Sequence, residues 1–352
     1  MPITYEPISE IKKSEFNFDL FDKNQPVVIR GLVEDWPLVK ASSSNIEDLV
    51  SHILCYYEGD RVLAFASSPE SGNKFTYANS DTRKSFSEME TTLDLLLETI
   101  LELKDKDNPS TAYMGSTSID YVLPGLSKDN NFVINNESPI KSIWIGNSTV
   151  VPPHFDVPDN IAFVCSGKRR FTLFPPDQVK NLYVGPLEFT PAGQPISLVD
   201  IYEPDLNKFP KFEEAKDLGQ SAELLPGDAI FIPSLWWHQV ESFGPLNVLI
   251  NYWWRDVPSF MGNPMDALMH SILSVRDLPD HQKENWINMF KHYVFNYENK
   301  NFDHIPEDIH GAVGNIDDNL AKKIGRLCLC LQSWRTPARL WSWCNRRPSR
   351  SC

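Results

Sequence analysis

Between Thr111 and Asp256 the chain alternates short apolar segments with turn-forming residues, and this pattern limits the fold more than any other feature. The segments are rich in β-branched and aromatic side chains, and Pro-Pro, Pro-Gly-Asp and Ser-Gly-Lys separate them. Such spacing favours an all-β sandwich or barrel over alternating strands and helices. The strands that we expect are 142–145, 161–165, 170–174, 229–232 and 248–253, with a Pro- and Asp-rich insertion at 186–212.

Helical patterns precede this region. Residues 45–54 begin with the candidate N-cap Asn45 and continue with apolar side chains at helical spacing. A second helix is expected over 86–103, because Ser87 and Glu90 fit a capping box and leucines follow at three- and four-residue steps. These helices flank the expected β region on its N-terminal side.

Helical spacing returns after the β region, at residues 265–275 and 281–295. Beyond a polar connector the composition changes to Arg, Trp, Ser and Cys without clear periodicity. This tail is either a basic docking segment or a sequence end without a folding history, and we favour the second interpretation. The expected organisation is a domain at 1–256, a helical region at 257–310 and a basic tail at 311–352.

The formal net charge of −14 is unevenly distributed. Eight of the 33 basic residues lie after Asp318, where no acidic residue occurs, so the rest of the chain holds 25 basic and 47 acidic residues, a balance of −22. A body this acidic repels phosphate backbones and argues against nucleic acid as a partner. No apolar run reaches the ~18–20 residues of a membrane helix. The N-terminal sequence lacks the pattern of a signal peptide, so the expected location is cytoplasmic.

His154-Phe155-Asp156 and the distant His238 carry the chemistry that we expect. In a strand, residues i and i+2 share a face, so His154 and Asp156 can present an imidazole and a carboxylate to one ion. A turn, a short apolar strand and a proline corner then lead to His238, beside two tryptophans. Two histidines and one carboxylate form the facial triad of non-haem Fe(II) oxygenases. A histidine beside tryptophans is often only a packed core residue, so the interpretation depends on both motifs together.

Two longer runs contain these motifs. The first begins with Pro153-His-Phe-Asp, continues through Gly167-Lys-Arg-Arg-Phe and ends at Pro176. The second begins with Pro226-Gly-Asp, continues through Trp237-His238 and ends with Asn251-Tyr-Trp. They resemble the JmjC and cupin-like (cupin_8) 2-oxoglutarate oxygenases, the family of the asparaginyl hydroxylase of the hypoxia-inducible factor. The resemblance implies a double-stranded β-helix, a jelly-roll core plus C-terminal helices. It also implies that His154, Asp156 and His238 bind Fe(II) at the open mouth of this barrel.

The resemblance further implies a basic residue that binds the distal carboxylate of 2-oxoglutarate. Lysine is usual in the family, and Arg169 occupies the position here. Arginine can bind a carboxylate bidentately, so Arg169 can bind the distal carboxylate in place of the usual lysine. The adjacent Lys168 would face the opposite side of a strand. The alternative to cosubstrate binding is that these basic side chains only form a solvated charge cluster. A second departure is Val151, where the family has a hydroxyl residue three positions before the histidine.

Tyr113 matches the family tyrosine that contacts 2-oxoglutarate, and Asn160 and Asn251 match polar positions of that pocket. An asparagine in an apolar strand is costly unless it is hydrogen-bonded, so satisfaction by the backbone is the alternative role for each. The β region contains five tryptophans, Trp144, Trp236, Trp237, Trp253 and Trp254. We expect most of them to pack in the core and one or two to form the wall of a substrate site.

The function that the resemblance implies is a dioxygenase (hydroxylase) that uses Fe(II), 2-oxoglutarate and O₂ to hydroxylate a C–H bond. A side chain of a protein or peptide is the first substrate expected. The alternatives are a small molecule or a modified tRNA base, or a metal-binding cupin with non-oxidative chemistry. The helices after the barrel support dimerisation in the relatives, so a homodimer is expected as well, although the apolar side chains there could equally pack on the chain's own barrel.

Overall fold

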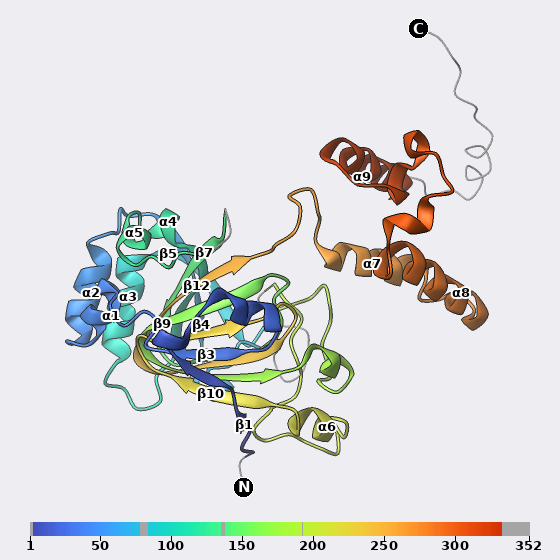
Figure 1. The fold of residues 1–352 in the computed structure, drawn as a ribbon. Helices are drawn as coiled ribbons and strands as arrows, with labels where there is room; N and C mark the ends of the chain where they lie inside the picture. The colour runs from blue at the N-terminus through green and yellow to red at the C-terminus, as the bar shows by residue number, and fades with distance from the viewer. Residues whose placement is uncertain (1–2, 78–83, 135–137, 192, 333–352) are drawn as a thin grey trace. The chain divides into compact units, whose positions relative to one another are not determined.

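A computed structural model describes residues 3–77, 84–134, 138–191 and 193–332 (Figure 1). The chain divides into two compact units, Met1–Asp256 and Val257–Cys352. Within the described ranges, no helix is both long enough and apolar enough to cross a membrane.

The first unit is built on strands that hydrogen-bond in the order β2-β3-β11-β9-β12-β7-β6-β4-β5, while β10 joins β9 and β1, and β8 joins β12. The strands are β1 (Glu6–Pro7), β2 (Glu10–Lys12), β3 (Val27–Arg30), β4 (Arg61–Ser67), β5 (Phe86–Thr92), β6 (Thr111–Ser118), β7 (Ile140–Gly146), β8 (Thr149–His154), β9 (Asp159–Phe174), β10 (Gln220–Leu224), β11 (Ala229–Ile232) and β12 (Trp237–Trp254). The strands expected at 161–165 and 170–174 are two parts of β9, and the others are confirmed as parts of β7, β11 and β12.

The two longest strands, β9 and β12, each belong to two layers. The first half of β9 pairs with β11 and its second half with β10. The second half of β12 pairs with β7 and its first half with β8. Both strands change direction where these halves meet, at Gly167 (φ +76°) in β9 and at the register shift between Phe243 and Val248 in β12. The result is the jelly-roll core that the resemblance implied, with helices beside it.

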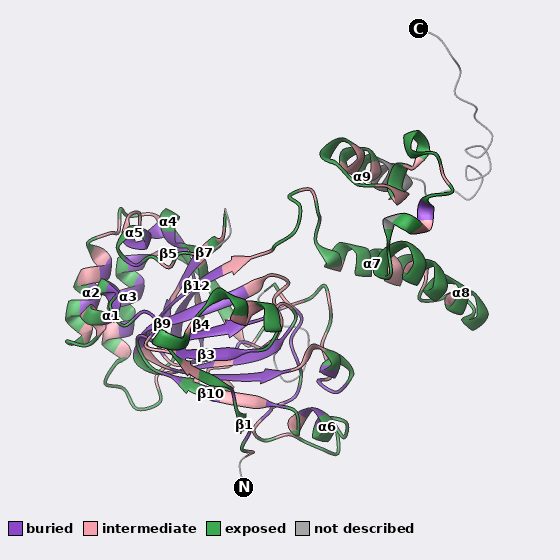
Figure 2. Cartoon of the chain, viewed as in Figure 1, coloured by how far each residue is buried: buried purple, intermediate pink, exposed green. Residues whose placement is uncertain are grey.

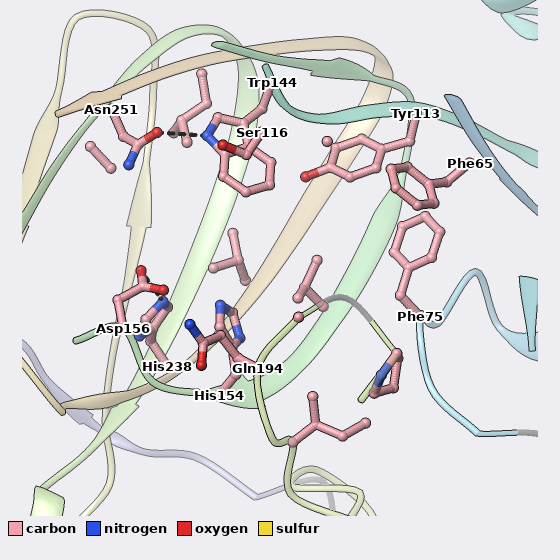
Figure 3. Close-up of a pocket in the computed structure, with 18 of the residues that line it drawn as sticks. Phe65, Phe75, Tyr113, Ser116, Trp144, His154, Asp156, Gln194, His238 and Asn251 are labelled. Atoms are coloured by element: carbon pink, nitrogen blue, oxygen red, sulfur yellow. Dashed lines mark hydrogen bonds and ion pairs between the residues drawn. The ribbon is translucent and has the colours of Figure 1, made fainter. Parts of the chain in front are cut away.

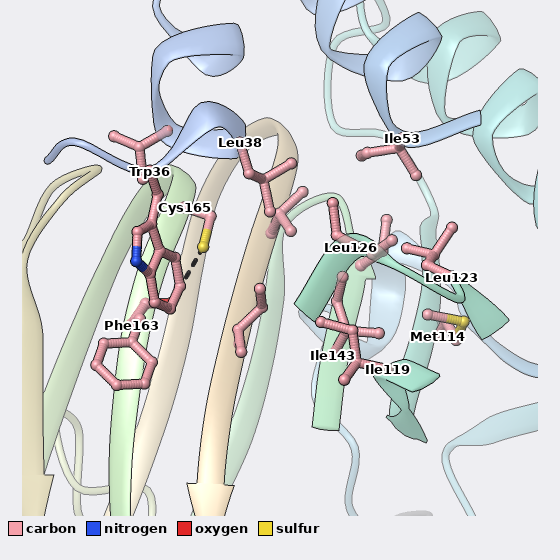
Figure 4. Packing of buried hydrophobic residues seen from close by; sticks show 14 of the residues in the cluster. Trp36, Leu38, Ile53, Met114, Ile119, Leu123, Leu126, Ile143, Phe163 and Cys165 are labelled. Carbon is pink, nitrogen blue, oxygen red and sulfur yellow. Dashed lines mark hydrogen bonds between the residues drawn. The ribbon is translucent and has the colours of Figure 1, made fainter. Parts of the chain in front are cut away.

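Apolar side chains fill the space between the two layers and cover the larger layer from outside. The inner cluster combines residues of both layers, among them Phe171 and Ile230. The outer cluster joins the larger layer to the helices α1 (Pro37–Ser42), α2 (Ile46–Leu54), α3 (Leu93–Leu103), α4 (Ile119–Val122) and α5 (Leu126–Asp129) (Figures 1 and 2). Figure 4 shows Trp36 packed on Phe163, with ring centroids 5.0 Å apart. Burying a side chain of this kind contributes about 1.5–3 kcal/mol.

One expected helix is confirmed and another begins later than expected. Asn45 caps α2, because its side chain accepts a hydrogen bond of 2.7 Å from the backbone N–H of Asp48. The helix expected over 86–103 is wrong in its first half, since 86–92 form β5 and α3 begins only at Leu93. Pairing with β4 along the whole of β5 outweighs the local capping-box signal. The leucine repeat that indicated a helix starts where α3 starts.

The insertion expected at 186–212 lies in the longer segment between β9 and β10. Its ends pack on the outer face of the smaller layer through Leu182, Phe209 and Phe212, the last in helix α6 (Phe212–Lys216). Short 3-10 helices complete this unit at Lys13–Glu15, Phe18–Lys23, Pro69–Ser71 and Pro176–Lys180.

The second unit contains the helices α7 (Pro264–Ser274), α8 (Asp280–Phe290) and α9 (Asp318–Gln332), and a π-helical turn at Lys291–Phe295. The two helices expected after the barrel are confirmed, and neither α7 nor α8 buries a residue. The part of the basic tail up to residue 332, where the sequence shows no clear periodicity, has a helical backbone in α9. Residues 333–352 lie outside the described part. Further 3-10 helices lie at Asn299–Phe302, Glu307–Ile309 and Gly311–Val313.

Candidate metal centre and its cavity

The fold brings His154, Asp156 and His238 together. His154 ends β8 and is paired in register with His238 at the start of β12, so the two ring centroids lie 4.2 Å apart. Nε2 of His238 lies 3.6 Å from Oδ2 of Asp156. One ligand atom from each residue lies within 4.8 Å of the others. Asp156 is not in a strand as its spacing predicted, since β8 ends two residues earlier, and its backbone C=O accepts a hydrogen bond from Leu235 N–H instead.

Both imidazoles are oriented so that Nε2 is free to bind an ion. Nδ1 of His154 lies 2.9 Å from the backbone oxygen of Pro152, and Nδ1 of His238 lies 2.9 Å from that of Trp236. A carbonyl oxygen only accepts, so each Nδ1 carries the proton and each Nε2 keeps its lone pair. Burial lowers the pKa of His238 to about 4, helped by His154 and opposed by Asp156. A neutral imidazole is the form that binds a metal.

A chain of buried and half-buried hydrogen bonds holds the carboxylate of Asp156. Its Oδ2 accepts from the indole N–H of Trp253 at 3.0 Å and from the amide of Asn160 at 3.4 Å. Asn251 donates to Asn160 at 3.1 Å and accepts from the indole of Trp144 at 2.7 Å (Figure 3). An indole can only donate and a carboxylate can only accept, so the two ends of the chain fix the orientation of both amides.

This network assigns contacts to residues that the sequence left ambiguous. Asn160 and Asn251 line the cavity, and the hydrogen-bond partners of their amides are side chains and not the backbone. Trp144 and Trp253 also line it and donate hydrogen bonds, a role that the core interpretation missed. A signal existed in the sequence, because an asparagine inside an apolar strand requires a polar partner nearby.

The three residues open on a cavity of about 540 Å³ inside the jelly-roll, a size typical of small-molecule sites. One side of its wall is aromatic, with Phe65, Phe75, Tyr113 and Trp144, and Gln194 of the insertion lies near the histidines (Figure 3). Val151 lines this cavity where the family has a hydroxyl residue, and the hydroxyl groups of Ser116 and Thr117 belong to the same lining.

Arg169 lies in the cavity lining and is only 3% exposed. Its Nε and Nη2 have no hydrogen-bond partner among the described residues. Burial lowers its pKa, and burial also raises the pKa of nearby Tyr113 to about 12, an effect that the guanidinium opposes. Lys168 faces outward and pairs with Glu223 at 3.1 Å. The guanidinium also shares a hydrogen bond with Tyr113 but pairs with no carboxylate among the described residues. A buried cation without a counter-ion is costly, so this cavity is suited to an anion such as a carboxylate.

The residues present also fit Fe(II). Two imidazoles and one carboxylate are the donor set of the facial triad, which leaves open positions on the ion. Each imidazole has a backbone acceptor on its other nitrogen, and the carboxylate has two donors on one oxygen. Such partners are the ones that normally orient metal ligands.

The jelly-roll core and the cavity inside it define a cupin-like protein. Residues 13–260 match the family described as the cupin-like domain, which is more than half of the chain, and the chain belongs to that family. It is 30% identical to the HSPB1-associated protein 1 of Rattus norvegicus over 151 residues, which are 42% of this chain and 31% of that protein.

Two further relatives have names that state an activity. The tRNA wybutosine-synthesizing protein 5 of Mus musculus is 34% identical over 145 residues, 40% of this chain and 40% of that protein. The lysine-specific demethylase JMJ31 of Arabidopsis thaliana is 34% identical over 110 residues, 31% of this chain and 19% of that protein. The matched region spans less than half of each of these relatives.

Proposed function

We propose that this chain is an Fe(II)- and 2-oxoglutarate-dependent oxygenase that hydroxylates a C–H bond in a side chain of a protein or peptide. The observation that carries the proposal is that the His154, Asp156 and His238 ligand set and the guanidinium of Arg169, whose Nε and Nη2 have no partner among the described residues, line one cavity. Membership of the cupin-like family supports the class. The similarity to a protein named as a lysine-specific demethylase supports a protein substrate.

The chain's own groups would bind and orient the reactants. His154, Asp156 and His238 would hold the ion through Nε2, one carboxylate oxygen and Nε2, and leave positions open for the cosubstrate and O₂. Arg169 would bind the distal carboxylate of 2-oxoglutarate through the N–H groups of its free Nε and Nη2. When bound, Fe(II) with 2-oxoglutarate and O₂ supplies the oxidation that converts C–H into C–OH, with succinate and CO₂ as the other products. The aromatic wall would exclude water from the cavity.

A cupin with non-oxidative chemistry would need the metal ligands but not the buried cation. The unsatisfied Nε and Nη2 of Arg169 therefore favour a cosubstrate that carries a carboxylate. A second candidate substrate is a modified tRNA base or a related small molecule, favoured by the 34% identity to tRNA wybutosine-synthesizing protein 5. The balance of −22 outside the tail disfavours a large RNA surface on this chain.

Anaerobic titration tests the proposal. The purified chain is mixed with Fe(II) and then with 2-oxoglutarate, and we expect a visible absorption band that forms only when both are present and is absent in Asp156→Ala. Admission of O₂ should then release succinate in step with loss of 2-oxoglutarate. A chain that binds Fe(II) without forming this band on addition of 2-oxoglutarate would contradict the proposal and indicate other cupin chemistry.

We also propose that residues 1–256 are the catalytic domain and that residues 257–310 join two copies in a homodimer. The support is the apolar surface of α7 and α8, which bury no side chain within their own unit. Exposed apolar residues on these helices are Leu268, Leu273, Trp286, Ile287 and Met289. A second copy would remove this surface from water.

A further inference from the structure

The strand β5 lies at one end of the sheet and has a free edge. It pairs with β4 along its whole length, and no other strand of the described residues pairs with it on the far side. Residues 87–90 are exposed. A terminal strand presents a row of unpaired N–H and C=O groups to any polypeptide that can align with it.

One face of this strand pair belongs to the cavity. Phe86 and Glu88 of β5 line it, together with Leu63 and Phe65 of β4. Val62 of β4 points to the opposite face, into the buried core beside the helices. Side chains alternate along a strand, so a segment added at the edge of β5 would turn every second side chain toward the cavity face.

A continuous aromatic wall connects this edge to the metal centre. Ring centroids lie 5.0 Å apart for Phe86 and Phe75, 5.3 Å for Phe75 and Tyr113, 6.2 Å for Tyr113 and Trp144, and 5.9 Å for Trp144 and Trp253. The last ring donates the hydrogen bond to the triad carboxylate described above. Figure 3 shows the inner part of this wall. The free edge and the candidate ligands therefore belong to one continuous surface.

We propose that an extended segment of the protein substrate docks on the free edge of β5 as an additional strand, which places one of its side chains along the aromatic wall. This inference rests on the proposed function and specifies its substrate as an unfolded or strand-forming stretch of polypeptide. Backbone pairing supplies affinity in this mode, and alternate side chains supply specificity.

The charges on the edge favour polypeptide over nucleic acid. Glu88 forms an ion pair with Lys84, and Glu90 forms one with Arg61 at 3.4 Å. Both cations are therefore already paired with carboxylates and are not available to bind a phosphate. A nucleic acid also lacks the alternating donors and acceptors that a strand edge requires. A second copy of the chain pairing β5 with β5 is the other polypeptide occupant, and the experiment separates it from a substrate.

The probe is a short peptide selected from a random library against the chain loaded with Mn(II) and 2-oxoglutarate. Hydrogen exchange followed by mass spectrometry should show slower exchange over 86–92 when the peptide binds. Exchange at β2, the strand at the opposite end of the sheet order, should not change. N-methylation of the peptide backbone should weaken binding with a period of two residues, because alternate N–H groups face the edge.

Two proline variants test the edge from the side of the protein. Met89 and Glu90 are exposed and lie outside the cavity lining, and their N–H groups point to opposite edges of β5. One of Met89→Pro and Glu90→Pro therefore removes a backbone hydrogen bond to β4, whereas the other removes a free N–H of the edge together with its exposed side chain, which for Glu90 includes the ion pair with Arg61. The variant that keeps the wild-type melting temperature should keep 2-oxoglutarate binding and lose peptide affinity by about fivefold.

Several outcomes would overturn the docking proposal. These are failure to select any peptide that protects 86–92, protection by an RNA oligonucleotide instead, protection that depends on protein concentration without peptide, or full peptide affinity in the stable proline variant. Mn(II) and 2-oxoglutarate binding are measured on the same samples. Loss of that binding would contradict the proposed function itself, so the two failures are distinguishable.

Discussion

The indole N–H of Trp253 donates a 3.0 Å hydrogen bond to Oδ2 of Asp156. One carboxylate oxygen is therefore held by a group that can only donate a hydrogen bond. We expect Trp253→Phe to keep the ring in the wall and to remove this bond. Affinity for Mn(II) or Co(II), measured by calorimetric titration, should fall by about 10–100-fold, as for other partners of metal ligands.

Trp254→Phe is the matched control for this change. Trp254 stacks on Phe231, with centroids 6.0 Å apart, and does not line the cavity. Its substitution should lower the melting temperature without changing metal affinity. Equal metal affinity in Trp253→Phe and the wild type would show that the hydrogen bond does not position Asp156.

Arg169→Ala should weaken 2-oxoglutarate binding by about 10–100-fold, because a charge-assisted hydrogen bond contributes about 1.5–3 kcal/mol. The readout is the visible band under anaerobic conditions, titrated with 2-oxoglutarate at saturating Fe(II). Without cosubstrate the variant should be about as stable to urea as the wild type, since it removes a buried cation that pairs with no carboxylate among the described residues but also removes a hydrogen bond with Tyr113.

Lys168→Ala is the control, because Lys168 pairs with Glu223 on the outer side of the same strand. It should leave the 2-oxoglutarate titration unchanged. A titration that shifts in Lys168→Ala and not in Arg169→Ala would show that the wrong basic residue had been chosen.

The sequence named the three candidate metal ligands but not the groups that hold them. His154 and Asp156 are two residues apart and a Pro-Gly-Asp turn precedes the strand that leads to His238, so local motifs pointed to all three residues, although Asp156 lies beyond the strand that the spacing assumed. The donors to Asp156 lie on β9 and β12, and only the pairing of those strands brings Asn160 and Trp253 beside it. Such contacts depend on register between distant segments, which a single sequence does not specify.

The start of α3 shows the same limit for the fold. Ser87 and Glu90 fit a capping box, yet both lie in β5, where each is paired in register with a residue of β4. β5 forms because it pairs with β4, which lies more than twenty residues away in the sequence. The residue types of 86–92 suit either state, so the deciding contact is non-local.

Ile287→Glu should convert dimers into monomers if α7 and α8 join two copies. Ile287 is 51% exposed on α8, and a carboxylate there is costly to bury in an apolar interface. Light scattering coupled to size exclusion gives the mass. Lys283→Gln, on the same helix, should leave the mass unchanged. A wild-type chain that is monomeric at all concentrations tested would contradict the dimer.

The alkaline limit of stability should depend on Cys165. Burial raises the pKa of its thiol from 9.0 to about 12. Between these values the unfolded chain loses the proton and the folded chain keeps it, so the free energy of unfolding falls as pH rises, by up to about 1.4 kcal/mol per pH unit. Below pH 9 both states keep the proton and this contribution does not change.

Urea unfolding from pH 8 to pH 11 under reducing conditions measures this effect, and Cys165→Ala should decline less steeply above pH 9. Tyr113, whose pKa is raised by burial from 10.0 to about 12, adds a second decline above pH 10 that the variant retains. Cys55→Ala is the control, because that thiol is exposed. The same slope in Cys165→Ala and the wild type would mean that the buried thiol ionises as readily in the folded chain as in the unfolded one.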